Sequence, residues 1–214
     1  MLTCRWFLLS VSFFGFGTLT KANVIDFETG SFLLGVGQTG TLDGFNFTTG
    51  GQSSSFLLAP VMPNSCIPSC ISNGTQPLGA FNGATVMMDP IISGETFALD
   101  SFDVAGTATA GSTRNVTSIR VIGNLVGGGQ ATQTFAVTPN VFQTLTLNSS
   151  FVELTSVEFD GLLPIGLNSP EFQLDNITYT PAAVPEPSSK LLVATVLLAA
   201  ALAAVRRKPL EPLP

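Results

Sequence analysis

The side chains best suited to chemistry in this sequence are carboxylates. The chain of 214 residues contains no His, which excludes a Ser-His-Asp triad, a Cys-His dyad and any His-ligated metal site. Two carboxylates about 5–10 Å apart could hydrolyse a glycosidic bond. Because twelve acids in residues 23–181 form such pairs by chance, a carboxylate-dependent hydrolase is the least favoured function. The twelve are Asp26, Glu28, Asp43, Asp89, Glu95, Asp100, Asp103, Glu153, Glu158, Asp160, Glu171 and Asp175.

Cysteine offers a second candidate chemistry. Cys66 and Cys70 are separated by Ile67-Pro68-Ser69, within a stretch rich in Pro, Asn, Ser and Gly. In an exported, oxidising compartment this pair predicts a disulfide that closes a short surface loop. Two thiols without His or further Cys make only half a zinc site, and the spacing is not the C-x-x-C of redox proteins.

Overall charge narrows the function classes further. The whole chain has 8 Lys and Arg against 14 Asp and Glu, with a sequence pI of about 4.4, so it is not a basic nucleic-acid-binding protein. Between residues 23 and 181 the only basic side chains are Arg114 and Arg120. Such a domain is expected to be soluble and to repel anionic polymers.

Residues 1–22 have the three parts of a signal peptide. Arg5 gives a positive start, and residues 7–17 form an apolar core too short for the roughly 20 residues of a bilayer span. Thr20 and Ala22 are small residues at the spacing of a cleavage site, so cleavage is expected near Ala22. An uncleaved N-terminal anchor is the alternative. Cys4 precedes the apolar core and is therefore no lipid-anchor candidate.

The C-terminal part of the chain has the pattern of a membrane-spanning helix followed by a cluster of basic residues, which we call the basic stop. Residues 182–190 form a Pro-rich linker, and residues 191–205 are an apolar run of 15 residues interrupted only by Thr195, or roughly 22 Å of helix. This helix could cross the membrane with some thinning of the bilayer. Arg206, Arg207 and Lys208 follow at once, and by the positive-inside rule the tail 206–214 stays cytoplasmic.

The order Val184-Pro185-Glu186-Pro187, apolar helix and Arg206-Arg207-Lys208 resembles the PEP-CTERM protein-sorting domain. The resemblance implies a bacterial envelope protein processed by a membrane exosortase, with the cut near the Pro-Glu-Pro motif and the helix then discarded. The chain continues past the basic cluster to Pro214, where the family usually stops sooner. A permanent single-pass anchor is the alternative that hydropathy alone allows.

The exported middle, residues 23–181, is expected to be one all-β domain. It is rich in Thr, Val, Ile and Phe, and Gly and Pro residues separate its apolar segments. No stretch of it has a sustained apolar period of 3.6 residues, which a helix would show. Many short strands separated by turns indicate a β-sandwich or barrel. The predicted strands are 24–28, 44–49, 54–58, 84–88, 97–104, 117–123, 130–137, 142–147, 156–160 and 172–179.

Two of these segments share the pattern F-x-L-D-x-Φ-x-Φ, where Φ is apolar. It occurs at Phe97–Val104 and at Phe172–Tyr179. In each, the apolar positions change parity after the Asp, so a regular strand would split them between two faces. One extra residue at Asp100-Ser101, and another at Asp175-Asn176, would return all four to one face, and we therefore predict a β-bulge in each strand.

The opening Val24–Glu28 and the closing Leu174–Ile177 resemble the first and last strands of jelly-roll carbohydrate-binding domains. The resemblance implies a jelly-roll-like β-sandwich with neighbouring termini and a structural Ca²⁺ held by carboxylates there. Ca²⁺ takes six to eight oxygens, which Asp26, Glu28, Asp175 and nearby carbonyls could partly supply. Solvated acids at a strand edge are the alternative interpretation.

These observations predict a non-enzymatic exported protein with a structural or adhesive role at the cell surface or in the extracellular matrix. Its expected partners are the exosortase and secretion machinery, the inner membrane through residues 191–205 before processing, and exopolysaccharide, but no nucleic acid. A carbohydrate- or calcium-binding module is the alternative function. The expected organisation is signal peptide 1–22, ectodomain 23–181, sorting motif and linker 182–190, transmembrane helix 191–205 and tail 206–214.

Overall fold

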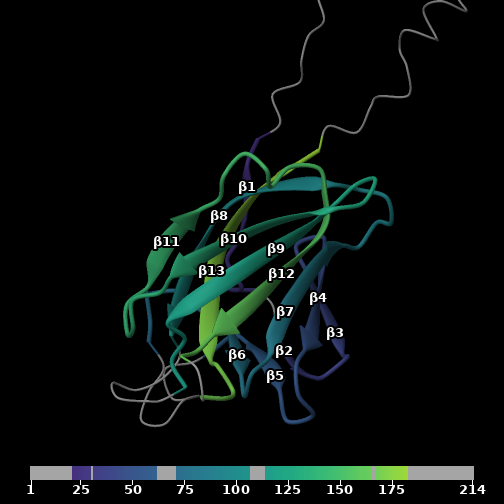
Figure 1. The fold of residues 1–214 in the computed structure, drawn as a ribbon. Helices are drawn as coiled ribbons and strands as arrows, with labels where there is room; N and C mark the ends of the chain where they lie inside the picture. The colour runs from purple at the N-terminus through teal and green to yellow at the C-terminus, as the bar shows by residue number, and fades with distance from the viewer. Residues whose placement is uncertain (1–20, 30, 62–70, 107–113, 165–166, 183–214) are drawn as a thin grey trace, which may run out of the picture. The chain divides into compact units, whose positions relative to one another are not determined.

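All regular elements in the described part of the chain are β-strands. The computed structural model describes residues 21–29, 31–61, 71–106, 114–164 and 167–182. Thirteen strands are present in these ranges, and hydrogen bonds join them into one continuous sheet that folds into two layers (Figure 1). The predicted all-β sandwich is therefore confirmed. The described ranges contain no helix long and apolar enough to cross a membrane.

The first layer is built around the last strand, and we call it the β13 layer. Strand β1 pairs with the second half of β13, antiparallel, with Val24 opposite Thr178, so the first and last strands are neighbours as predicted. Strand β6 occupies the same side of β13 along its first half. The order across the layer is β2 (Phe32–Gly35), β5 (Phe56–Ala59), β6 (Leu78–Phe81) with β1 (Asn23–Ile25), β13 (Phe172–Pro181), β8 (Phe97–Gly106) and β11 (Gln143–Thr146).

The second layer, which we call the β12 layer, lies against the first. A single residue pair, Leu154 opposite Phe97, connects it to β8. Every neighbouring pair of strands in this layer is antiparallel. The order across it is β10 (Gln130–Ala136), β9 (Ser118–Leu125), β12 (Leu154–Leu162), β7 (Thr85–Pro90), β4 (Phe45–Gly50) and β3 (Thr39–Leu42).

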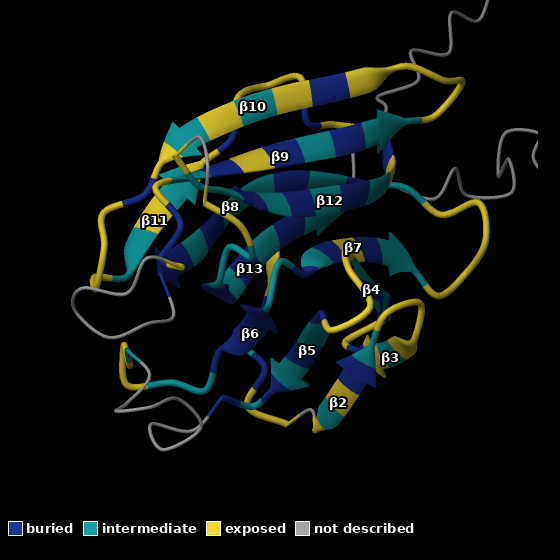
Figure 2. Cartoon of the chain, turned by 60° about the horizontal axis from the view of Figure 1, so that its bottom comes forward, coloured by how far each residue is buried: buried dark blue, intermediate teal, exposed yellow. Residues whose placement is uncertain are grey.

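Phenylalanine fills the space between the layers. Phe102 on β8 meets Phe159 on β12 edge to face, with ring centroids 5.1 Å apart, and Phe45 on β4 meets Phe97 on β8 in the same way at 5.1 Å. Such edge-to-face pairs stabilise the folded state by more than the burial of their apolar area alone would. In the β12 layer, buried and less buried residues alternate along strands such as β4 and β12, as expected when only one face is covered (Figure 2).

The two predicted bulges are present. Between the pairs Asp175–Asp103 and Thr178–Ser101, β13 advances three residues while β8 advances two, so β13 has one extra residue next to Asp175. Between Thr178–Ser101 and the pair Tyr179–Leu99, the extra residue is on β8 at Asp100. The apolar positions of both repeats are consequently buried on one face: Phe97, Leu99, Phe102, Val104, Phe172, Leu174, Ile177 and Tyr179.

The structure also has three strands that the sequence did not predict. They are β2, β3 and β6, each of four residues and each containing a glycine. Each of the ten predicted strands overlaps a strand of the structure, with ends that differ by a few residues. The predicted signal peptide lies almost wholly outside the described residues, and the predicted transmembrane helix lies wholly outside them.

Candidate functional site

The outward face of the β12 layer carries an array of mainly polar side chains. One row crosses all six strands at directly opposed positions, and none of its six residues is buried. Neighbouring strands are about 4.8 Å apart, so neighbouring side chains in the row are separated by about the width of one sugar ring. The row runs Thr132, Ile122, Glu158, Met87, Thr48 and Thr39.

A second row lies beside the first and is made of amides, hydroxyls and a carboxylate. The side-chain amide of Gln130 donates to Asn124 Oδ1 at 3.0 Å, and Asn124 Nδ2 donates to Ser156 Oγ at 2.8 Å. On the far side of β12, Asn46 Nδ2 donates to Asp89 Oδ2 at 3.0 Å. These bonds fix the orientation of each amide. We call the two rows, with Thr41 opposite Asn46, the β12 face.

Two apolar side chains lie near the centre of the β12 face, one on each side of Glu158, and an ion pair lies along one flank. Met87 is 37% exposed between Glu158 and Thr48, and Ile122 is partly exposed on the next strand but one. Arg120 forms an ion pair with Asp160 along one flank, with their side chains 44% and 18% exposed. The face and this flank together carry one cation against three carboxylates, Asp89, Glu158 and Asp160, so their charge disfavours an anionic ligand.

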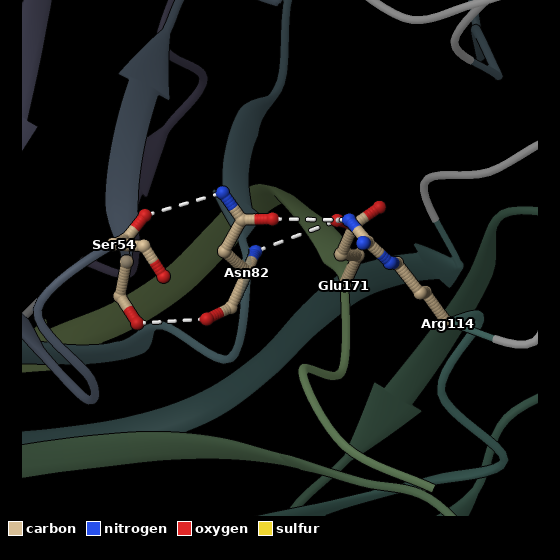
Figure 3. Close-up of polar contacts among 5 residues, drawn as sticks. Ser54, Asn82, Arg114 and Glu171 are labelled. Atoms are coloured by element: carbon tan, nitrogen blue, oxygen red, sulfur yellow. Dashed lines mark hydrogen bonds and ion pairs between the residues drawn. The ribbon is translucent and has the colours of Figure 1, made fainter.

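A second polar cluster ties loops together at one end of the sandwich (Figure 3). Arg114 Nη1 donates to Asn82 Oδ1 at 3.1 Å and lies 3.2 Å from Glu171 Oε1. Asn82 Nδ2 donates to the Ser54 carbonyl at 3.1 Å, and Ser55 Oγ donates to the Asn82 carbonyl at 2.8 Å. These contacts join the β4–β5, β6–β7, β8–β9 and β12–β13 connections, so we assign the cluster a structural role.

The structure shows what the predicted calcium ligands contact. Asp26 Oδ1 accepts from the Glu28 backbone N–H at 3.1 Å, and Glu28 Oε1 accepts from the Gln76 N–H at 2.8 Å. Asp175 Oδ2 accepts from Asn73 Nδ2 at 2.9 Å and from the Thr75 hydroxyl. Glu28, just after the first strand, and Asp175 on the last strand therefore hold the segment 73–76, whereas the Asp26 bond is local.

Asp175 is the one carboxylate here that is fully buried. Burial raises the pKa of this group, while hydrogen bonds from Thr75, Asn73 and the Asn176 N–H lower it. Among the described residues, no group of three or more Asp, Glu, His or Cys is placed to hold a metal ion. Calcium binding by Asp26, Glu28 and Asp175 stays a prediction.

The other predicted site residues fall on parts of the chain outside the described ranges. They are the disulfide pair Cys66 and Cys70, the sorting motif Val184, Pro185, Glu186 and Pro187, and the basic stop Arg206, Arg207 and Lys208. The sequence prediction in turn missed the β12 face. The sequence did show polar residues alternating with apolar ones in the predicted strands. It did not show the register that aligns those polar residues across six strands.

Comparison with known proteins gives only distant structural likenesses. No family model and no curated protein matches the chain. The structure is similar to a variant of the family 29 carbohydrate-binding module CBM29-2, with a TM-score of 0.44, 10% identity, and coverage of 76% of this chain and 92% of that one. It is also similar to the family 32 module of C. perfringens NanJ in complex with galactose, with a TM-score of 0.37, 11% identity, and coverage of 69% and 99%.

An enzyme is among the structural neighbours as well. The agarase AgWH50C aligns with a TM-score of 0.41 and 11% identity, over 87% of this chain and 33% of that one. At these scores and identities the likenesses establish neither a common family nor a shared ligand. The β-sandwich itself follows from the strand pairing described above.

Proposed function

We propose that residues 23–181 form a non-catalytic carbohydrate-binding domain whose β12 face binds a neutral polysaccharide. The observation that carries the proposal is the pair of mainly polar rows across the β12 layer, with amides held by hydrogen bonds to their neighbours. Each sugar hydroxyl both donates and accepts, and amide, hydroxyl and carboxylate groups supply both functions. The exposed Met87 offers an apolar surface to the face of a sugar ring.

We also propose that this domain is exported and sorted at the cell surface through its C-terminal segment. Support comes from the sequence alone, in the order Val184–Pro187, the apolar residues 191–205 and Arg206–Lys208. An exopolysaccharide ligand is consistent with such a location. In this proposal the structural or adhesive role of the protein is to attach to that polymer.

Affinity electrophoresis of the purified full chain in non-ionic detergent tests the binding proposal. The gels contain a neutral glucan, a galactan or a mannan, and retardation by at least one of them is expected. The double variant Asn46→Ala with Asn124→Ala should lose retardation, because each lost hydrogen bond is worth about 1 kcal/mol, or about five-fold in affinity. Asn168→Ala is the matched control, since Asn168 is an exposed asparagine away from the β12 face.

Two outcomes would refute the proposal. One is equal retardation of the double variant and wild type, and the other is no retardation by any neutral polysaccharide tested. Repeating the gels with EDTA separates calcium-dependent binding from binding by the β12 face, which needs no metal. Thermal unfolding of each variant confirms that it is folded.

A further inference from the structure

Strand β10 is the longest edge strand in the described part of the chain. It pairs only with β9, along an unbroken register from Gln130 opposite Asn124 to Ala136 opposite Ser118. The other described strands with a single neighbour are β1, β2, β3 and β11, and each has only three or four residues. Figure 2 shows β10 at the margin of the β12 layer. One side of its seven-residue backbone is therefore open to a further strand.

Hydrogen bonds just beyond the two ends of β10 show which of its backbone groups are open. At one end the Leu125 N–H donates to the Gly129 carbonyl at 3.1 Å, and at the other the Val137 N–H donates to the Thr117 carbonyl at 2.9 Å. In an antiparallel pair, successive residues direct their backbone groups alternately toward the partner strand and away from it. Odd-numbered residues of β10 therefore bond to β9. The backbone groups of the even-numbered residues point to the open side: Gln130, Thr132, Thr134 and Ala136.

One end of this open side is already occupied by a side chain. Gln143 Nε2 donates to the Ala136 carbonyl at 2.8 Å. For Gln130, Thr132 and Thr134, the strand pairing of the described residues provides no backbone partner on this side. The side chains of these three residues are exposed as well. The backbone available to a strand from another molecule is thus centred on Thr132.

Strand β10 lacks the features that usually protect an edge strand from pairing, which are charge, proline and bulges. Its sequence is Gln-Ala-Thr-Gln-Thr-Phe-Ala, and its register with β9 is not shifted anywhere. The surrounding sequence is uncharged too, because residues 121–152 contain no Asp, Glu, Lys or Arg. All twelve carboxylates of residues 23–181 lie outside this stretch. Two copies of this acidic domain can therefore meet along β10 without like charges on directly opposed residues.

We propose that β10 pairs antiparallel with β10 of a second copy of this chain, about a two-fold axis at Thr132. The strand is complementary to itself in this register: Thr132 lies opposite Thr132 of the second copy, and Gln130 lies opposite Thr134. Each of these pairs exchanges both N–H···O bonds, and paired threonines stabilise neighbouring strands. Because the even-numbered side chains of β10 are on the β12 face, the dimer joins two such faces into one. The proposal does not depend on polysaccharide binding.

Sedimentation velocity of the purified full chain in density-matched non-ionic detergent tests this pairing. A dimer that dissociates on dilution is expected. Thr132→Pro should weaken it by about tenfold or more, because proline removes the central N–H without breaking a bond to β9. Thr134→Lys should weaken it as well, because it places a charge on the edge strand.

Thr41→Pro is the matched control on β3, at the opposite edge of the same layer. Leu42 and Phe45 flank the two-residue turn of the β3–β4 hairpin and form its hydrogen-bonded pair, so the Thr41 N–H points away from β4. This proline therefore also removes an open N–H from an edge strand, yet it should leave the dimer intact. Thermal unfolding of each variant confirms that it is folded.

A cysteine at the proposed axis tests the register. Under mild oxidation Thr132→Cys should form an intermolecular disulfide more rapidly than wild type or Asn168→Cys, since the two copies of residue 132 face each other. A chain that stays monomeric up to about 100 μM would overturn the proposal, because a micromolar dimer is populated there. Dimers that persist in both β10 variants, equal loss of the dimer in Thr41→Pro, or no added disulfide in Thr132→Cys would overturn it too.

Discussion

Asp175 shows how a sequence can indicate where a carboxylate lies without indicating which residues contact it. The sequence placed it beside the first strand, and the pairing of β1 with β13 confirms that. Its three hydrogen-bond donors, however, are Asn73, Thr75 and the Asn176 N–H, and two of these belong to a loop about a hundred residues earlier. No local pattern could have indicated those partners, because they meet only in the folded chain.

Neutralising Asp175 should change how stability depends on pH. Because burial raises its pKa, the folded state binds the proton more tightly than the unfolded state does. The stability from this group is therefore present below the unfolded pKa of about 3.9 and is lost as pH rises through the raised folded pKa. The variant Asp175→Asn has no carboxyl at this position, so this contribution to the pH dependence of the free energy of unfolding should disappear.

The measurement for Asp175 is urea unfolding of wild type and Asp175→Asn from pH 3 to pH 7. The free energy of unfolding of wild type relative to the variant should fall as pH rises. Asp26→Asn is the control, because Asp26 is only partly buried. A relative stability that stays constant with pH, or rises, would contradict the assignment.

At the scale of elements, most of the strands were predictable and their partners were not. Alternation and turn residues located ten strands, and the parity change after Asp100 and Asp175 located both bulges. The three missed strands are short and contain Gly, which weakens the strand signal. For β3 a signal existed, since Asp43-Gly44 is a typical hairpin turn and takes positive φ at both positions.

The turn between β2 and β3 gives a test of backbone conformation free of side-chain crowding. Gly37 has φ of +75°, and a Cβ there would meet nothing within 4 Å. Gly37→Ala should therefore cost about 1–2 kcal/mol through the left-handed conformation alone. Gly35, two residues earlier, lacks a positive φ, and a Cβ there would make only ordinary contacts at 3.7 Å with Gln38.

Gly35→Ala is accordingly the matched control, at the end of the strand that precedes the same turn, with a change of about 0.5 kcal/mol or less in either direction. Chemical denaturation of both variants gives the two free energies of unfolding. Equal stabilities for Gly37→Ala and Gly35→Ala would show that the turn does not take the conformation described.

At the scale of the whole molecule, charge determines which polymers the protein can approach. Residues 23–181 contain twelve carboxylates against Arg114 and Arg120. We expect retardation by a neutral polysaccharide to change little between about 50 and 500 mM NaCl, because uncharged partners are not screened. A polyuronate should not retard the protein at low salt. Retardation by polyuronate that weakens as salt rises would contradict a neutral ligand.

The central claim is that the β12 face is the polysaccharide-binding surface, and two adjacent methionines test it directly. Met87 is exposed at the centre of that face, whereas Met88 is fully buried on the opposite side of the same strand. The measurement is a titration of the methyl-¹³C-methionine full chain with oligosaccharides of the retarding polysaccharide, with Met87→Leu assigning the signal. The account predicts that the Met87 methyl shifts saturably while the Met88 methyl does not. Saturable binding that leaves the Met87 methyl unmoved would contradict it.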